Sequence, residues 1–169
     1  MNIVKMKPDH WPAVKRIYQE GIATGDATFQ ESPPASWQEW SDGHLENCSL
    51  VCLDDQRVVG WAAISPVSNR PVFKGVGEVS VYVIKSCQEQ GIGEKLLNKL
   101  INISEQQGIW TLQAGIFLEN EKSLLLHKKS GFHEVGVRKR IGKMGYGHLS
   151  GVWRNVVLLE KRSQNVGIN

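Results

Sequence analysis

Apolar side chains recur every three or four residues in four stretches of the chain, a spacing that predicts amphipathic helices. The first stretch follows Asp9, a suitable N-cap, and the second follows Ser36, which has Glu39 at the capping-box position. The longest helix is expected over 91–107, and a short one over 120–131. Apolar stripes of this kind are typical of helices that pack one face on a core.

Strand-like apolar runs lie between and after these helices, and one of them alternates strictly between polar and apolar residues. The clearest is 78–83, in which Val79, Val81 and Val83 face one side and the intervening polar residues face the other. The other predicted strands are 50–53 and 58–65, joined as a hairpin by four polar residues, then 110–117, 132–138 and 153–161, with 2–6 as a further candidate.

The order of these elements predicts one α/β domain around a mixed sheet, over residues 1–163, followed by a polar C-terminal tail at 164–169. The composition, 41% hydrophobic and 22% charged, is that of a globular protein and excludes disordered and collagenous chains. No apolar run approaches the roughly 18 residues that would cross a bilayer, and no stretch near the N-terminus resembles a signal peptide. We therefore expect a cytoplasmic protein with no membrane partner.

Charge and cysteine content argue against several classes of partner and site. A net charge of +3 gives little support to nucleic-acid binding, so no nucleic-acid partner is expected. The three cysteines, Cys48, Cys52 and Cys87, form no CxxC pair, which argues against a disulfide framework and against a zinc site. We expect free thiols, mostly buried, and no metal.

The most informative segment is the turn between the strand at 78–83 and the long helix. Gly91 and Gly93 let the backbone approach a ligand closely, and the first N–H groups of a helix carry the positive end of its dipole. Such a turn suits a pyrophosphate, and a tight connection from strand to helix is the alternative explanation of the two glycines. It is neither a Walker loop, since no Gly-Lys-Ser/Thr follows, nor a Rossmann fingerprint, since Leu96 occupies the third glycine position.

Several motifs in this order resemble one known family. Gln88-x-x-Gly91-x-Gly93 after a Val-x-Val strand resembles the acyl-CoA motif of the GNAT acetyltransferases. The segments 24–33 (TGDATFQESP), 78–83 (EVSVYV) and 145–153 (GYGHLSGVW), together with Asn120, Leu126-His127 and Gly131-Phe132, resemble the phosphinothricin N-acetyltransferase branch of that family.

This resemblance, which covers nearly the whole chain, implies a splayed sheet that holds acetyl-CoA in the V between the strands at 78–84 and 110–117. The backbone of Val81 and Val83 would pair with the pantetheine arm, and the turn would hold the pyrophosphate. Lys95 and Lys128 are candidates for the CoA phosphates, with a solvated helix surface as the alternative. The residues implied in cofactor binding are Val81, Tyr82, Val83, Glu89, Gln90, Gly91, Ile92, Gly93, Glu94 and Asn120.

The resemblance also implies a catalytic residue. Glu78 occupies the position of the family's general base, which would leave the acceptor amine neutral for attack. His127 stands seven residues after Asn120, where many family members have a tyrosine, so it is either a general acid or a structural histidine. A covalent acyl intermediate on Cys87 is disfavoured, because direct transfer needs none and no paired histidine lies nearby in the sequence.

An acceptor pocket is expected from residues of several segments. Arg70 or Lys74 would bind an acceptor carboxylate, although 70–74 is equally well read as an exposed loop. The full candidate set is Thr28, Phe29, Glu31, Arg70, Phe73, Lys74, Tyr82 and the loop from Tyr146 to His148.

The sequence therefore predicts an acetyl-CoA-dependent N-acetyltransferase. Its acceptor would be the primary amine of a small amino-acid-like molecule of the phosphinothricin, methionine sulfoximine or methionine sulfone type, acetylated by direct attack in a ternary complex. Two alternatives stay open, acetylation of a protein or peptide amine and a silent acyl-CoA-binding regulator. A homodimer is expected from the family, and the six tryptophans fit a shared apolar surface.

Overall fold

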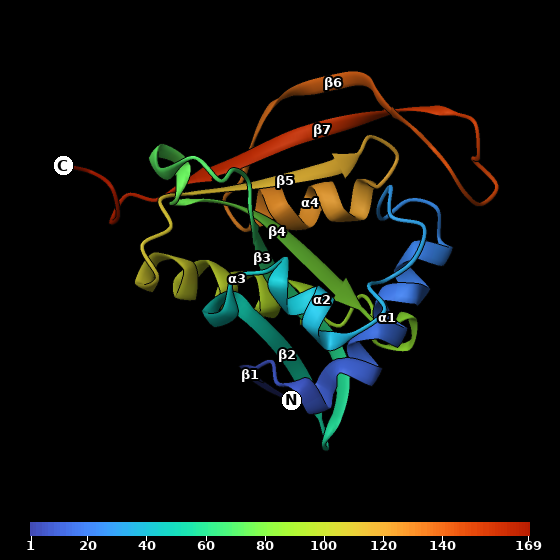
Figure 1. Ribbon diagram of the computed structural model, residues 1–169, viewed down its shortest axis with the longest axis horizontal. Coiled ribbons are helices and arrows are strands. Elements are labelled where there is room, and N and C mark those ends of the chain that lie inside the picture. Colours follow the sequence, from blue (N-terminus) through green and yellow to red (C-terminus); the bar gives the residue numbers. More distant parts are fainter.

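One mixed sheet of seven strands forms the centre of the computed structural model, which describes residues 1–169 (Figure 1). Its strands lie in the order β1-β2-β3-β4-β5-β7-β6, and β4 and β5 are the one parallel pair. The strands are β1 (Asn2–Lys5), β2 (Ser49–Asp54), β3 (Arg57–Pro66), β4 (Val76–Val83), β5 (Thr111–Phe117), β6 (His133–Lys143) and β7 (Trp153–Arg162). The helices are α1 (Trp11–Ala23), α2 (Trp37–Asp42), α3 (Ile92–Gln106) and α4 (Glu121–Lys129). The predicted α/β class is confirmed.

The helices cover the two faces of the sheet, and the strand register shows which face each covers. Trp61 lies opposite Tyr82 in the β3–β4 pair, and it packs against Tyr18 of α1 and Trp40 of α2. Gly60 points to the other face, where Leu96 of α3 lies against it. The face of Tyr82 is therefore covered by α1 and α2, and the opposite face by α3. None of the helices has the length and apolar character needed to cross a bilayer.

Three predicted details of the helices and strands differ in the structure. Pro8–His10 forms a 3-10 turn, so α1 begins at Trp11 and Asp9 is not its cap. Ser36 does cap α2, but the Glu39 carboxylate accepts from the Ala35 N–H, one residue before the capping-box partner. The strand β6 continues to Lys143, five residues beyond its predicted end, and its pairing with β7 is irregular between Arg138 and Gly142.

The parallel pair β4–β5 is short, and this positions the site. Only Val76, Gly77 and Glu78 pair with β5, through Thr111 to Gln113. Beyond that point β4 continues for five residues and β5 for four, and these residues do not pair with each other. Figure 1 shows the two arrows diverging. The sheet is therefore splayed, with Glu78 and Gln113 where the strands part.

The C-terminal tail lies against the domain. Arg162 donates to the Val166 carbonyl oxygen at 2.8 Å, and Asn165 donates to Glu105 of α3 at 3.1 Å. The domain boundary near residue 163 remains a prediction.

Candidate active site

A cleft of about 1940 Å³ lies between the diverging strands. It is lined by β4 and β5, by the segment between α1 and α2, by the start of α3 and by α4. Acceptor and cofactor candidates therefore share one continuous space.

The edge of β4 that faces the cleft carries unpaired backbone groups. In an antiparallel pair, residues whose N–H and C=O bond to the partner alternate with residues that point away from it. The Ile84 N–H donates to Val59, which places Tyr82 and Ser80 in the bonded set. Val81 and Val83 therefore direct their N–H and C=O groups toward the cleft, and of these groups the Val83 carbonyl oxygen already accepts a hydrogen bond from Gln88. An extended amide-containing chain could pair there like an added strand.

The turn after β4 ends in an open helix start. Gly91 is the N-cap of α3 and has a φ of 76°, in the left-handed region that favours glycine. A Cβ at Gly93 would lie 3.3 Å from Leu126 of α4, so glycine there lets the two helices approach. Gln88 donates to the Val83 carbonyl oxygen at 3.1 Å and ties the turn to the strand. The free N–H groups after Gly91 form a suitable site for a phosphate.

Two lysines of α4 reach across to this turn. Lys122 pairs with Glu89, and Lys129 pairs with Glu94 at 2.8 Å. The hydrogen bond from Lys122, reinforced by its charge, lowers the pKa of Glu89. All four side chains line the cleft, so Lys122 and Lys129 are the cations beside the phosphate turn.

The two lysines predicted for that role lie elsewhere. Lys95 does not line the cleft, and Lys128 pairs with Glu134 at 3.3 Å. Helix phase explains the difference, because positions 122 and 129 share a face of α4 and position 128 does not. Among the predicted cofactor residues, Gln90 and the buried Ile92 keep their side chains out of the cleft, and the others line it.

Glu78 lies at the vertex of the splay. Its carboxylate accepts a hydrogen bond of 3.0 Å from Gln113 Nε2, across the last pair of the parallel ladder. The side chain is exposed and lines the cleft, on the same face as Ser80 and Tyr82. This is a geometry in which a carboxylate can accept a proton from a bound amine.

His127 lies on α4 and is 4% exposed. Its Nδ1 lies 2.8 Å from the Ser123 carbonyl oxygen, which only accepts, so Nδ1 carries the proton. Burial lowers the pKa of this imidazole, so the neutral form prevails near pH 7. In that tautomer Nε2 accepts hydrogen bonds and has no proton to give to a leaving group.

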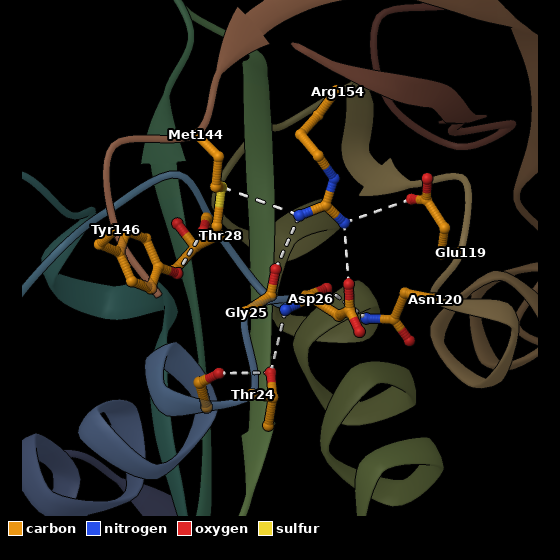
Figure 2. Close-up of polar contacts among 10 residues, drawn as sticks. Thr24, Gly25, Asp26, Thr28, Glu119, Asn120, Met144, Tyr146 and Arg154 are labelled. Atoms are coloured by element: carbon orange, nitrogen blue, oxygen red, sulfur yellow. Dashed lines mark hydrogen bonds and ion pairs between the residues drawn. The ribbon is translucent and has the colours of Figure 1, made fainter. Parts of the chain in front are cut away.

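Arg154 of β7 joins the loops that wall the cleft (Figure 2). It is 2% exposed and donates to the Gly25 carbonyl oxygen and to Asp26, each at 2.8 Å, and to Glu119 at 3.3 Å. Its guanidinium also lies 3.9 Å from the centre of the Phe117 ring. This residue, which the sequence motifs did not single out, ties the loop after α1 to the loop before α4.

Asn120 completes the connection between the same two loops. Its side-chain oxygen accepts from the Ser123 N–H and caps α4, and its Nδ2 donates to the Asp26 carbonyl oxygen at 3.0 Å (Figure 2). Asn120 therefore has a structural role at the wall of the cleft, and its contact with the cofactor remains a prediction.

Some of the predicted acceptor residues line the cleft and others do not. Thr28, Phe29 and Tyr82 line the cleft, and burial raises the pKa of the Tyr82 phenol, which stays neutral. The Arg70–Lys74 segment lies outside it as a short 3-10 turn, with Arg70 over the Phe73 ring at 5.5 Å.

The loop after β6 packs against the segment between α1 and α2 that lines the cleft. The Tyr146 hydroxyl donates to the Thr28 carbonyl oxygen at 2.7 Å, Glu31 packs against Gly145, and His148 packs against Gly25. None of Glu31, Tyr146 and His148 lines the cleft. Side chains that do line it, and that sequence reasoning missed, are Trp40, His44, Ser80 and Arg138.

Comparison with known proteins identifies the family. Residues 11–132 match the acetyltransferase (GNAT) family. The chain belongs to this family. A Bacillus subtilis (strain 168) protein named provisionally as a phosphinothricin acetyltransferase is 35% identical over 78% of this chain and 83% of its own. The phosphinothricin N-acetyltransferase of Alcaligenes faecalis is 32% identical over 92% of this chain and 79% of its own.

Solved structures agree with this GNAT assignment. A ribosomal-protein-alanine N-acetyltransferase from Brucella melitensis is 28% identical, with a TM-score of 0.85 over 96% of this chain and all of the other. A phosphinothricin acetyltransferase from Sinorhizobium meliloti, solved in complex with acetyl-CoA, has a TM-score of 0.85 at 24% identity, over 99% of this chain and 91% of the other. The second likeness shows the fold alone.

Proposed function

We propose that this GNAT protein transfers an acetyl group from acetyl-CoA to the primary amine of a small amino-acid-like acceptor. The observation that carries the proposal is the position of Glu78. This carboxylate opens into the cleft at the point where the paired part of β4 ends and its unpaired, ligand-facing edge begins.

Acetyl-CoA fits the residues on one side of the splay. The N–H and C=O groups of Val81 and the N–H group of Val83 pair with the amides of the pantetheine arm. The N–H groups that follow Gly91 bind the pyrophosphate, with Lys122 and Lys129 beside them. Acetyl-CoA supplies the thioester, and the protein positions it against the vertex.

Glu78 performs the proton chemistry. It accepts a proton from the acceptor ammonium, so that the nitrogen lone pair attacks the acetyl carbonyl carbon. The C–N bond forms and the C–S bond breaks, and the second proton that the nitrogen loses passes to the departing sulfur, so that CoA leaves as the thiol. Gln113 holds the carboxylate toward the cleft by its hydrogen bond to Oε2. The transfer is direct and uses no acyl-enzyme on Cys87.

The acceptor side of the cleft supports a small amino acid as substrate. Most of the segment from Thr28 to Ala35 lines the same cleft as Glu78, so a loop of the chain itself walls the space for the acceptor. Relatives with 28% identity over 78% of this chain are named L-methionine sulfoximine/L-methionine sulfone acetyltransferases, in Pseudomonas paraeruginosa and Pseudomonas aeruginosa. We assign this chain the same class of acceptor, together with phosphinothricin.

A CoA-release assay with three acceptor panels tests the proposal. The panels are phosphinothricin with methionine sulfone, the free proteinogenic amino acids, and peptides with a free N-terminus. We expect turnover with the first panel. Turnover with peptides alone would make the protein a peptide or protein acetyltransferase. Tight binding of acetyl-CoA with no turnover in any panel would make it a regulator.

Two further properties belong to this proposal, cytoplasmic location and homodimer formation. The edge strand β6 is unpaired on its outer side, and it carries the exposed apolar residues Val135, Val137 and Ile141. Exposed edges of this kind are usually covered in native proteins. We expect a dimeric mass in solution at micromolar concentration, and a monomeric mass would refute this part of the proposal.

A further inference from the structure

The charged side chains that line the cleft leave one cation without a partner. Three lysines or arginines line it, and two of them, Lys122 and Lys129, are paired with Glu89 and Glu94. The third, Arg138 of β6, is exposed and forms no ion pair. Arg138 is therefore the free guanidinium of this cleft.

Strand register places Arg138 on the same face as the predicted base. Phe117 of β5 lies opposite Val156 of β7, and Val156 lies opposite Arg138. Residues directly opposite in antiparallel strands share a face. Phe117 and Gln113 also share a face, because strand side chains alternate, and Gln113 bonds to Glu78. The anionic and cationic groups thus lie on one face of the splayed sheet, on the acceptor side.

We propose that Arg138 determines acceptor specificity by binding an anionic group at the end of the acceptor's side chain. This inference rests on the proposed function. A guanidinium binds a carboxylate or phosphinate through two parallel hydrogen bonds. The acceptor lies with its ammonium at Glu78 and its distal anion at Arg138.

The separation of the two groups decides which anion of the acceptor is bound. Three strand spacings across the sheet and four residues along it put the Cα atoms of Glu78 and Arg138 roughly 20 Å apart. An α-carboxylate stands only one carbon from its amine, so it cannot reach Arg138 while the amine is at Glu78. A phosphinate or carboxylate several bonds along the side chain is better placed.

The surroundings of Arg138 suit the side chain of such an acceptor. Phe29 stacks edge-on against Phe117 with ring centres 4.8 Å apart, and Val156 and Ile141 also line this part of the cleft. These apolar groups border the path between the two charges. They would cover the methylene groups of the acceptor and leave its two ends polar.

The test compares two acceptors of similar length, phosphinothricin with an anionic end and methionine sulfone with a neutral end. In Arg138→Gln we expect kcat/KM for phosphinothricin to fall by about 10–100-fold, the usual worth of a hydrogen-bonded charged group. The value for methionine sulfone should stay within about two-fold of wild type, and acetyl-CoA affinity should not change. Arg140→Gln, two residues along the same strand and stacked on Trp153, is the matched control.

Each contrary outcome is distinct. Equal losses for both acceptors, no loss for either, or a weaker acetyl-CoA affinity in Arg138→Gln would overturn the role of Arg138. A selective loss in Arg70→Gln instead would return the specificity to the predicted 70–74 segment. Absence of turnover by the wild-type enzyme with both acceptors would overturn the proposed function itself, and this inference with it.

Discussion

In the proposed function, the two sides of the splay recognise their ligands by different means. On the cofactor side the binding groups belong mainly to the backbone of one continuous stretch, from β4 through the turn to α3. On the acceptor side they are side chains from β4, β6, α1, α2 and the loop between the two helices. Backbone recognition depends on local conformation, whereas side-chain recognition depends on how distant segments pack.

The largest loss of turnover should come from substitution of Glu78, which lies between the two sides. Glu78→Gln keeps the size of the side chain and removes the base, so turnover near neutral pH should fall by about 10²–10⁴-fold. The loss should shrink as pH rises, because more of the acceptor amine is then already neutral. A pH–rate profile at saturating acetyl-CoA measures this. Weaker acceptor binding with unchanged saturated turnover would instead show that Glu78 only holds the ammonium.

Gly91→Asp should act on the cofactor side alone. It adds a carboxylate where the pyrophosphate is expected, and like charges at such distances cost several kcal/mol, so acetyl-CoA affinity should fall by more than about 100-fold. Gly108→Asp is the control, because Gly108 ends the same helix with a φ of 77° against 76° at Gly91, and nothing lies within 4 Å of either Cβ. Near-native affinity in Gly91→Asp would remove the turn from the cofactor site.

The fold, and the strand and turn that carry the proposed cofactor side, were predictable because their signals are local. Alternation along 78–83 and the two glycines at 91 and 93 are each contained in a few residues, and the structure has β4 and the start of α3 there. Arg138 and Arg154 carry no such signal, because their partners lie far away in the sequence. Arg154 is 128 residues from Asp26. Arg70, by contrast, looked suitable by residue type and lies outside the cleft.

Arg154→Met should lower the stability of the protein, because buried Arg154 holds together the two loops that wall the acceptor side. The change removes the cation from between Asp26 and Glu119, whose side chains are 42% and 57% exposed. We expect a loss of about 1–3 kcal/mol in the free energy of unfolding, because the carbonyl oxygen of buried Gly25 is left without its donor. Chemical denaturation measures it, with the exposed Arg140→Met as a control that should cost under about 1 kcal/mol. Equal costs would show that Arg154 does not support the wall.

The smallest effect concerns His127. Burial lowers its pKa in the folded state, so the unfolded state binds the proton more readily, and stability falls as pH drops below about 6.5. His127→Gln should therefore lose less thermal stability than wild type between about pH 7 and pH 5. His44, whose pKa burial also lowers, leaves a residual slope of the same sign. An unchanged or steeper slope in the variant would contradict the neutral state of His127 in the folded protein.

The division between the two sides is tested most directly by titrating acetyl-CoA into Glu78→Gln, with the wild type and Gly91→Asp alongside. If the backbone of β4 and α3 holds the cofactor, the dissociation constant for Glu78→Gln should lie within about two-fold of the wild-type value, a difference well under 1 kcal/mol, although this variant has lost turnover. A dissociation constant raised as far as that of Gly91→Asp would contradict the account, because Glu78 would then belong to the cofactor site.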